Sequence, residues 1–140
     1  MDATELLALY HASHYLVRLP GGRGRATLRI GEPIPQPLAE WLAGETFGFF
    51  ITAYNPHSVA QPAGANRRTQ KQLLDTVRAC GARVLPGVGR IPGQRWREPS
   101  LFVAGLSLSE VDALAEHHGQ NAIVLVQAHG IAELRCYAGC

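Results

Sequence analysis

The stretch FGFFITAYNPHSVAQPAGANRR, residues 47–68, decides the fold that the sequence predicts. Its first part, FGFFITA (47–53), is an almost continuous apolar run, as expected of a strand buried on both faces. Asn55-Pro56 ends this strand, because Pro56 has no N–H to give to a sheet and restricts the residue before it. We expect Asn66 to cap the helix that follows. A buried strand therefore leads through a polar loop into a helix.

Helical and strand patterns alternate on both sides of this stretch. Toward the C-terminus we expect, in order, a helix from 66, strand 82–87, a Gly/Pro-broken loop at 87–99, strand 101–106, helix 108–118 and strand 122–127. Helix 108–118 opens on Ser107-x-x-Glu110, the spacing of a capping box. Outside this core we expect helix 3–12, strands 14–19 and 26–30, helix 38–44 and a C-terminal strand at 131–137.

Starting from strand 47–53, the core order is βαββαβ, which is the ferredoxin-like arrangement of two split βαβ units on one antiparallel sheet. The sequence thus predicts an α+β fold. Its ferredoxin-like core spans about residues 47–127, with an N-terminal helix and hairpin and a C-terminal extra strand.

The composition fits one domain over residues 1–140, since the chain is 46% hydrophobic and 17% charged. No basic segment followed by an apolar run opens the chain, and no apolar run approaches the ~20 residues of a membrane span. We therefore expect a cytoplasmic protein with no membrane partner. Cys80 is expected in the core, and Cys136 and Cys140 are expected to be reduced, with a redox pair as the alternative.

Positive charge is concentrated in one part of the chain. Residues 67–97 hold eight basic residues and one acid, Asp75, a net +7, against a whole-chain net charge of +2. The remaining residues therefore carry −5. This arginine-rich stretch favours an anionic partner, either a small molecule or a nucleic acid, although the total charge is too small to establish either.

The predicted topology brings polar residues from distant segments to one end of the sheet. With right-handed crossovers, the end of strand 47–53, the start of the next helix, the loop 87–99 and the turn at 119–121 all lie there. The candidate ligand-binding residues at this end are Asn55, His57, Asn66, Arg67, Arg68, Ser100, Gln120 and Asn121, and Glu98 is the candidate catalytic residue.

Arg67 and Arg68 indicate the charge of a possible ligand. Positive side chains at a helix start oppose the helix dipole, but two guanidinium groups beside free backbone N–H groups suit phosphate or carboxylate. Close arginines would lower the pKa of Glu98 and favour a role as a base or as a ligand of a cation over a role as an acid. The alternatives are that both arginines are simply solvated, that Glu98 forms an ordinary ion pair, and that the amides only tie loops together.

Other motifs are weaker. Gly87-x-Gly89 is not a dinucleotide-binding motif, because no helix follows it. The loop 87–99 is expected to be a flexible flap, in which Trp96 either stacks on a base or anchors the loop to the core. The histidine pairs lack the spacing of a metal site, so we expect no metal and no cofactor.

Five ordered blocks resemble a bacterial family designated domain of unknown function 3293 (DUF3293). The blocks are FITAYNPHS (50–58), NRRTQKQLL (66–74), VLPGVG (84–89), REPSLFVAGL (97–106) and HHGQNAIVLV (117–126). The matching positions are Asn55, Pro56, Asn66, Arg67, Glu98, Ser100, Gly119, Gln120 and Asn121, whereas His118 stands where such sequences often have Phe. The resemblance implies no established activity, but it implies that these positions define the family.

The sequence therefore predicts a polar pocket that binds an anionic ligand, either phosphate-bearing or nucleotide-like. The rival hypothesis is a non-catalytic module that binds nucleic acid or protein through residues 67–97. A third is that the polar network is purely structural. The sequence leaves open whether the protein is an enzyme.

Overall fold

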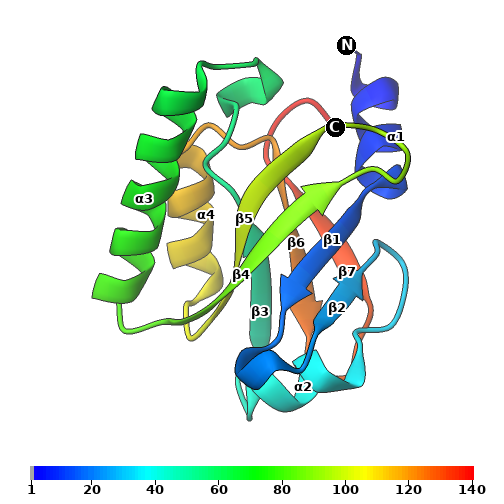
Figure 1. Cartoon of the computed structure of the whole chain (residues 1–140), viewed down its shortest axis with the longest axis vertical. Helices are drawn as coiled ribbons and strands as arrows, with labels where there is room; N and C mark the ends of the chain where they lie inside the picture. Colours follow the sequence, from blue (N-terminus) through cyan, green and yellow to red (C-terminus); the bar gives the residue numbers. More distant parts are fainter. Residues whose placement is uncertain (1) are drawn as a thin grey trace.

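The structure is a computed structural model that describes residues 2–140, and it is a mixed α+β fold (Figure 1). Its helices are α1 (Ala3–Ala12), α2 (Gln36–Leu42), α3 (Ala63–Ala79) and α4 (Leu108–His117). Its strands are β1 (His14–Arg18), β2 (Arg25–Leu28), β3 (Phe47–Ile51), β4 (Arg83–Arg90), β5 (Arg97–Ala104), β6 (Ala122–Gln127) and β7 (Ala132–Cys136). Two short 3-10 turns lie at Pro20–Gly22 and Pro56–Ser58.

All seven strands of residues 2–140 form one sheet in the order β2-β1-β4-β5-β3-β6-β7, and every neighbouring pair is antiparallel. The segment after β2 also reaches the opposite edge of the sheet, where Ile30 and Pro33 form isolated bridges to Ala132 and Ile131. The two ends of the strand order are therefore close in space. The sheet curls into a half-barrel with an inner and an outer face.

Each face of the curled sheet has its own apolar core. On the outer face, α3 and α4 pack side by side over β3, β5 and β6 (Figure 1), burying Phe49, Leu73, Val77, Val103 and Val111 completely. Inside the curl, side chains from all seven strands meet Leu38 and Leu42 of α2. Helix α2 closes this end of the half-barrel, and Arg83 holds it there by donating to the carbonyls of Trp41 (2.7 Å) and Leu42 (2.9 Å).

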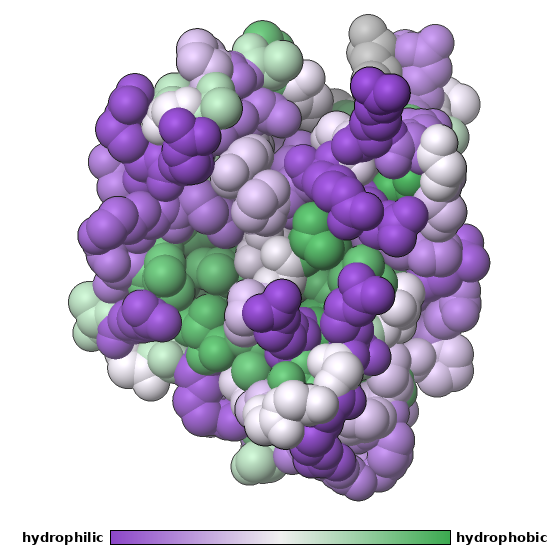
Figure 2. Space-filling model, in the orientation of Figure 1, coloured by the Kyte–Doolittle hydropathy of each residue, from purple (hydrophilic) through white to green (hydrophobic). Residues whose placement is uncertain are grey.

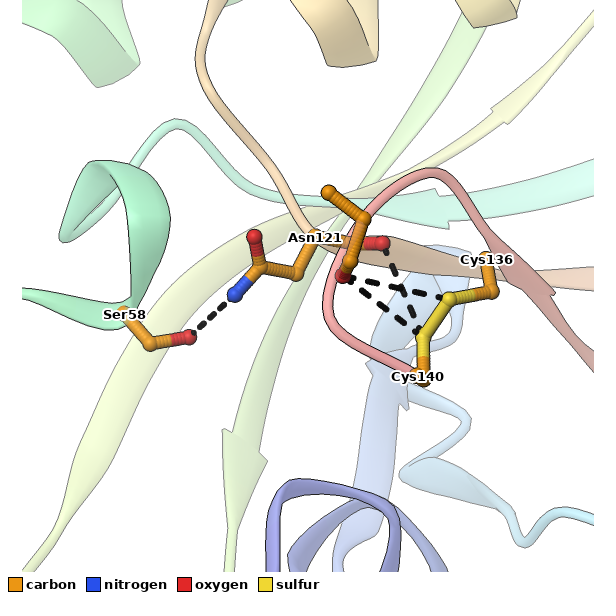
Figure 3. Close-up of a disulfide and its surroundings, with 5 residues drawn as sticks. Ser58, Asn121, Cys136 and Cys140 are labelled. Atoms are coloured by element: carbon orange, nitrogen blue, oxygen red, sulfur yellow. Dashed lines mark hydrogen bonds between the residues drawn. A yellow bond between two sulfur atoms is a disulfide. The ribbon is translucent and has the colours of Figure 1, made fainter. Parts of the chain in front are cut away.

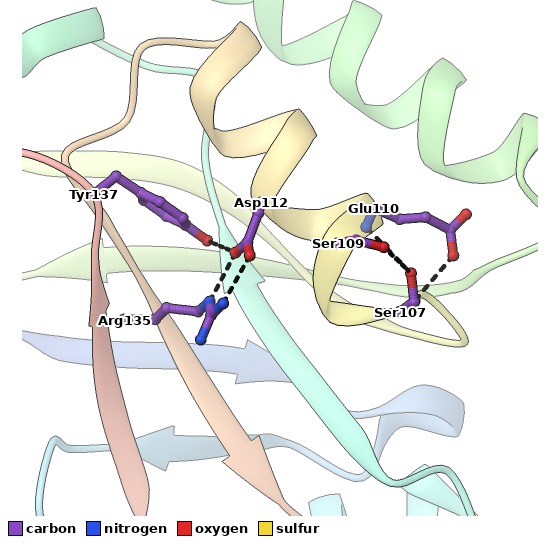
Figure 4. Close-up of polar contacts among 6 residues, drawn as sticks. All are labelled: Ser107, Ser109, Glu110, Asp112, Arg135 and Tyr137. Carbon is purple, nitrogen blue, oxygen red and sulfur yellow. Dashed lines mark hydrogen bonds and ion pairs between the residues drawn. The ribbon is translucent and has the colours of Figure 1, made fainter.

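The predicted elements are all present with shifted ends. Strands β4, β5, β3 and β6 are consecutive in the sheet, and the segment 47–127 keeps the expected strand and helix order. The capping box is confirmed: the N–H of Glu110 donates to Ser107 Oγ (3.2 Å), and the N–H of Ser107 donates to Glu110 Oε1 (3.0 Å) (Figure 4).

Two local predictions are wrong. Helix α3 begins at Ala63, so Asn66 lies inside the helix and does not cap it. Most of residues 87–99 is strand and not loop, because β4 and β5 pair from Arg83 opposite Ala104 to Arg90 opposite Arg97, which leaves residues 91–96 as the connecting loop. The glycines in β4 suggested a loop by local propensity, but pairing with β1 and β5 on both sides keeps this segment extended.

The cysteine predictions are also corrected. Cys80 is exposed, because it lies at the C-cap of α3, beyond the buried stripe formed by Leu73 and Val77. Cys136 and Cys140 are joined by a disulfide next to Asn121 (Figure 3). None of the helices in residues 2–140 is both long enough and apolar enough to cross a membrane.

Candidate functional site

A cavity of about 390 Å³ lies inside the curl, at the opposite end from α2. Its walls are α1, the inner face of the sheet and the loops that follow β3 and β4. The aromatic residues of the wall are Tyr10, Tyr15, Phe50, Tyr54 and Trp96. The hydrogen-bonding side chains include Asn55, Ser58, Gln94, Glu98, Ser100 and Gln120. Its volume is in the lower part of the range of small-molecule sites, and such a wall of aromatic groups with few polar ones is typical of them.

Glycines on β4 help to create this space. Cross-strand pairing places Gly89 between Tyr15 of β1 and Glu98 of β5. A Cβ atom at Gly89 would meet nothing nearer than Trp96 Cη2 at 3.5 Å, an ordinary van der Waals contact, so there is room for a methyl group. At Gly87, two residues earlier on the same face, a Cβ atom would lie 2.8 Å from Phe50 Cε2. The cavity thus begins where the packed core ends, between these two glycines.

Among the described residues 2–140, Glu98 is the only one of the cavity wall that is charged in its usual state at neutral pH, and none of these lining residues is Lys, Arg or His. Burial raises the pKa of its carboxyl group, and hydrogen bonds from the side chains of Asn55 and Trp96 oppose this. The bond from Asn55 Nδ2 to Glu98 Oε2 is long, at 3.4 Å. The sequence predicted arginines beside Glu98 and a lowered pKa. That prediction is wrong, because no arginine lines the cavity and the pKa shifts upward.

Two tyrosines from separate elements face the same space. The hydroxyl of Tyr15 donates to the backbone carbonyl of Tyr10 at 3.0 Å, joining β1 to α1. Burial, followed by the charge of Glu98, raises the pKa of Tyr10 to about 12. Burial also raises the pKa of Tyr15. Both phenols are therefore neutral at physiological pH, and Glu98 is the acidic group that can place a negative charge in the cavity.

The loop after β3 is fixed by a reciprocal amide pair. Asn66 Nδ2 donates to Asn55 Oδ1 (2.8 Å), and the backbone N–H of Asn55 donates to Asn66 Oδ1 (3.0 Å). The same Asn55 Oδ1 accepts the N–H of Gln61 at 3.1 Å. Asn55 has a positive φ of 47°, a conformation that asparagine tolerates better than most residues. Asn66 is therefore buried, and its side-chain amide is occupied by hydrogen bonds to Asn55.

Three further hydrogen bonds join this loop to the turn after α4. The N–H of His57 donates to the carbonyl of Gly119 (2.7 Å), and Gln120 Nε2 donates to that of Tyr54 (3.1 Å). Asn121 Nδ2 donates to Ser58 Oγ at 2.9 Å (Figure 3). The topology-based prediction that these two segments meet is confirmed. Most of their polar groups form hydrogen bonds with one another, which agrees with the alternative hypothesis that these amides tie loops together.

The predicted site residues divide into two groups. Asn55, Glu98, Ser100 and Gln120 line the cavity, although the Ser100 hydroxyl donates to the carbonyl of Glu98 at 2.9 Å. The residues that do not line it are His57, Asn66, Arg67, Arg68 and Asn121. Both arginines are exposed on α3, and their guanidinium groups lie near Gly64 in the first turn.

Sequence reasoning missed the tyrosines and the role of Gly89. Tyr10 was placed correctly on the first helix, but nothing local indicated that this helix would cover the sheet. A signal was present in Gly87-x-Gly89, since two glycines two residues apart share one face of a strand. If this segment is a strand, the two glycines leave one of its faces without side chains, and this indicates space for a cavity on that face.

A second polar cluster ties α4 to β7 (Figure 4). Arg135 donates from Nε and Nη2 to the two carboxylate oxygens of Asp112, both at 2.7 Å, and the Tyr137 hydroxyl donates to Oδ1 at 2.6 Å. Arg135, chiefly, lowers the pKa of Asp112. Every charge here has a partner, so the cluster is structural. Within residues 2–140 no group of His, Cys, Asp and Glu is arranged to hold a metal ion.

A family comparison agrees with the resemblance noted in the sequence. The model of the family described as "Protein of unknown function (DUF3293)" matches residues 51–123, which is just over half of the chain. This range runs from the end of β3 to the start of β6 and includes Asn55, Glu98 and Gln120. Searches of curated proteins and of solved structures give no significant match. The chain therefore belongs to the DUF3293 family.

Proposed function

We propose that this protein binds a small organic molecule in the cavity inside the curled sheet, and that the ligand carries a protonated amine. The observation that supports this is Glu98: a largely buried carboxyl group faces a cavity to which residues 2–140 contribute no basic side chain. A carboxylate in such a place is costly unless a cation or several donors meet it. An ammonium group would supply both.

The aromatic wall suits the same ligand. Tyr10, Tyr54 and Trp96 come from three different segments and border the space next to Glu98. Aromatic faces attract cations, and their apolar surface would bury the hydrocarbon part of an amine. The expected ligand is therefore an aliphatic or aromatic amine with few other charges. This replaces the anionic ligand predicted from the sequence, because Arg67 and Arg68 lie outside the cavity.

Catalysis by Glu98 stays a prediction. The hypothesis that Arg67 and Arg68 bind an oxyanion beside Glu98 is not supported, because neither arginine lines the cavity. A carboxyl group with a raised pKa could exchange a proton with a bound ligand. Binding is the simpler function that the same geometry supports.

Fluorescence offers a direct binding test, because the chain has two tryptophans and only Trp96 lines the cavity. The variant Trp41→Phe leaves Trp96 as the reporter. We would titrate it with 2-phenylethylamine, 2-phenylethanol and 3-phenylpropanoate, which differ mainly in their polar end. The amine should bind at least about tenfold more tightly than the other two, since a hydrogen-bonded charge contributes ~1.5–3 kcal/mol.

Two variants control the interpretation. Glu98→Gln keeps the shape of the side chain and removes its charge, so it should abolish the preference for the amine. Gly89→Leu should fill the cavity and weaken all three compounds. If no compound changes the emission of Trp96, or if Gly89→Leu binds as well as its parent, binding in the cavity is refuted. If the alcohol binds as tightly as the amine, only the assignment of the ligand's charge fails.

We also propose that residues 1–140 are one domain with a ferredoxin-like core at about 47–127. The consecutive order β4-β5-β3-β6 supports this, with α3 and α4 on one face.

We also propose a cytoplasmic location, where the Cys136–Cys140 disulfide would tend to be reduced. Alkylation of the protein directly in lysed cells would report which form is present.

A further inference from the structure

The outer face of the sheet is covered by helices on one side only. Helices α3 and α4 pack against β3, β5 and β6, whereas none of the helices of residues 2–140 packs against the outer face of β2 and β1 (Figure 1). Tyr15, Val17, Ala26 and Leu28 point into the curl. Because side chains alternate along a strand, their neighbours along β1 and β2 point outward.

These outward residues form cross-strand rows rich in arginine. Arg18 of β1 lies directly opposite Arg25 of β2, and Arg90 of β4 lies directly opposite Arg97 of β5. His14 continues the second row, opposite Arg90. Between the two rows lies a third, formed by Thr27, Leu16, Val88 and Pro99. Figure 2 looks onto this side and shows hydrophilic side chains around an apolar band over β1 and β4.

No acidic residue balances these charges. The outward positions of the three rows contain neither Asp nor Glu. None of the four arginines forms an ion pair within residues 2–140, where the ion pairs involve Arg29, Lys71 and Arg135 instead. Like charges directly opposite each other destabilise a sheet, so two such pairs on one face work against folding.

Protection of the sheet edge does not account for the pattern. Positive charge on an edge strand discourages pairing with other chains, and this could explain Arg25, since β2 is an edge strand. Arg90 is paired on both sides, with His14 of β1 and Arg97 of β5. Arg18 and Arg97 belong to interior strands of the sheet, although each is paired on one side only. Local rules are most often broken where a protein meets a partner.

We infer that this face, defined by Arg18, Arg25, Arg90 and Arg97, binds the phosphate backbone of a nucleic acid. Unpaired guanidinium groups on a rigid, acid-free surface complement a line of phosphates. The rows contain no Phe, Tyr or Trp on which a base could stack, so contacts should go mainly to the backbone and not to the bases. This set overlaps only partly with the predicted arginine-rich module: Arg90 and Arg97 lie within 67–97, whereas Arg18 and Arg25 lie outside it.

The inference predicts a specific dependence on salt. Four phosphate contacts to a duplex give a slope of about −3.6 in log affinity against log salt, or about a 150-fold loss between 50 and 200 mM. We would measure the fluorescence anisotropy of a labelled 30-base-pair DNA duplex and of a 30-nucleotide single strand. Arg90→Gln/Arg97→Gln and Arg18→Gln/Arg25→Gln should each halve the slope. Neither should lower the melting temperature, since each relieves repulsion.

The matched control is Arg67→Gln/Arg68→Gln, which removes two exposed arginines from α3 and makes the same change in charge. Its slope should equal that of the wild type. If the control loses as much affinity as the sheet variants, the contact lies elsewhere or is non-specific, and the assignment to this face is wrong. Absence of binding to both nucleic acids at 50 mM salt overturns it outright.

Discussion

Gly89 and Gly87 allow a sharp test of where the packed core ends and the cavity begins. Both lie on the inner face of β4, and neither has a positive φ, so alanine fits the backbone at both. The substitutions Gly89→Ala and Gly87→Ala therefore differ only in what the added methyl group meets. At 89 it meets Trp96 Cη2 at 3.5 Å, and at 87 it meets Phe50 Cε2 and the Leu16 carbonyl oxygen, both at 2.8 Å.

Gly89→Ala should stabilise the protein. Restricting the unfolded chain contributes ~0.4–1 kcal/mol, and partial burial of the methyl group adds to it, for about 1 kcal/mol in total. For a chain of this size that raises the melting temperature by roughly 4 °C. Gly87→Ala gains the same entropy, but overpacking costs ~1–3 kcal/mol, so it should be destabilising by about 1–2 kcal/mol.

The assay is urea unfolding followed by circular dichroism, with the m-value checked for each variant. The two variants should differ by about 2–3 kcal/mol with opposite signs. Equal destabilisation by both would mean that the space above Gly89 is filled, and the cavity and the function proposed for it would both lose their basis.

Three further substitutions test other parts of the structure. Gly119→Ala should lower the free energy of unfolding by about 2–4 kcal/mol in a urea titration, since φ of Gly119 is +62° and the new Cβ would lie 2.9 Å from Pro56 Cβ. A loss of less than about 1 kcal/mol would contradict the tight contact between the two loops. Glu98→Gln should raise the melting temperature at pH 7, because burial raises the pKa of the carboxyl group and its ionised form is disfavoured in the folded state. That gain should vanish near pH 4, where the carboxyl group is largely protonated whether folded or unfolded; a gain that is the same at both pH values would refute the charge as its cause. Tyr137→Phe should lose about 1 kcal/mol by removing the 2.6 Å bond to Asp112, and thermal melts that match the wild type would show that Arg135 alone suffices.

Much of the fold was predictable because its signals are local. The apolar runs at 47–53 and 122–127, the capping box at Ser107 and the stop at Gly81 gave the order of the elements within a few residues. Right-handed crossovers then brought the loop after β3 to the turn after α4, where the bond from Gln120 to Tyr54 joins them. These inferences need only periodicity, helix capping and chain direction.

The site was only half predictable, because its chemistry depends on which side chains end up facing each other. The sequence alone determined that Asn55, Glu98, Ser100 and Gln120 would gather at one end of the sheet, and the structure brings them to one cavity. It also placed Arg67 there, but the true start of α3, at Ala63, turns that side chain outward.

Only the tertiary structure decided the charge and shape of that cavity. The curl of the sheet, made by pairing between segments about a hundred residues apart such as Ile30 and Ala132, lets α1 cover the inner face and brings Tyr10 toward Glu98. The same curl turns the arginines of β1, β2, β4 and β5 to the outside. Pairing between distant strands leaves no pattern in the local sequence. Neighbouring residues therefore could not predict which side chains line the apolar, acidic interior and which form the basic outer face.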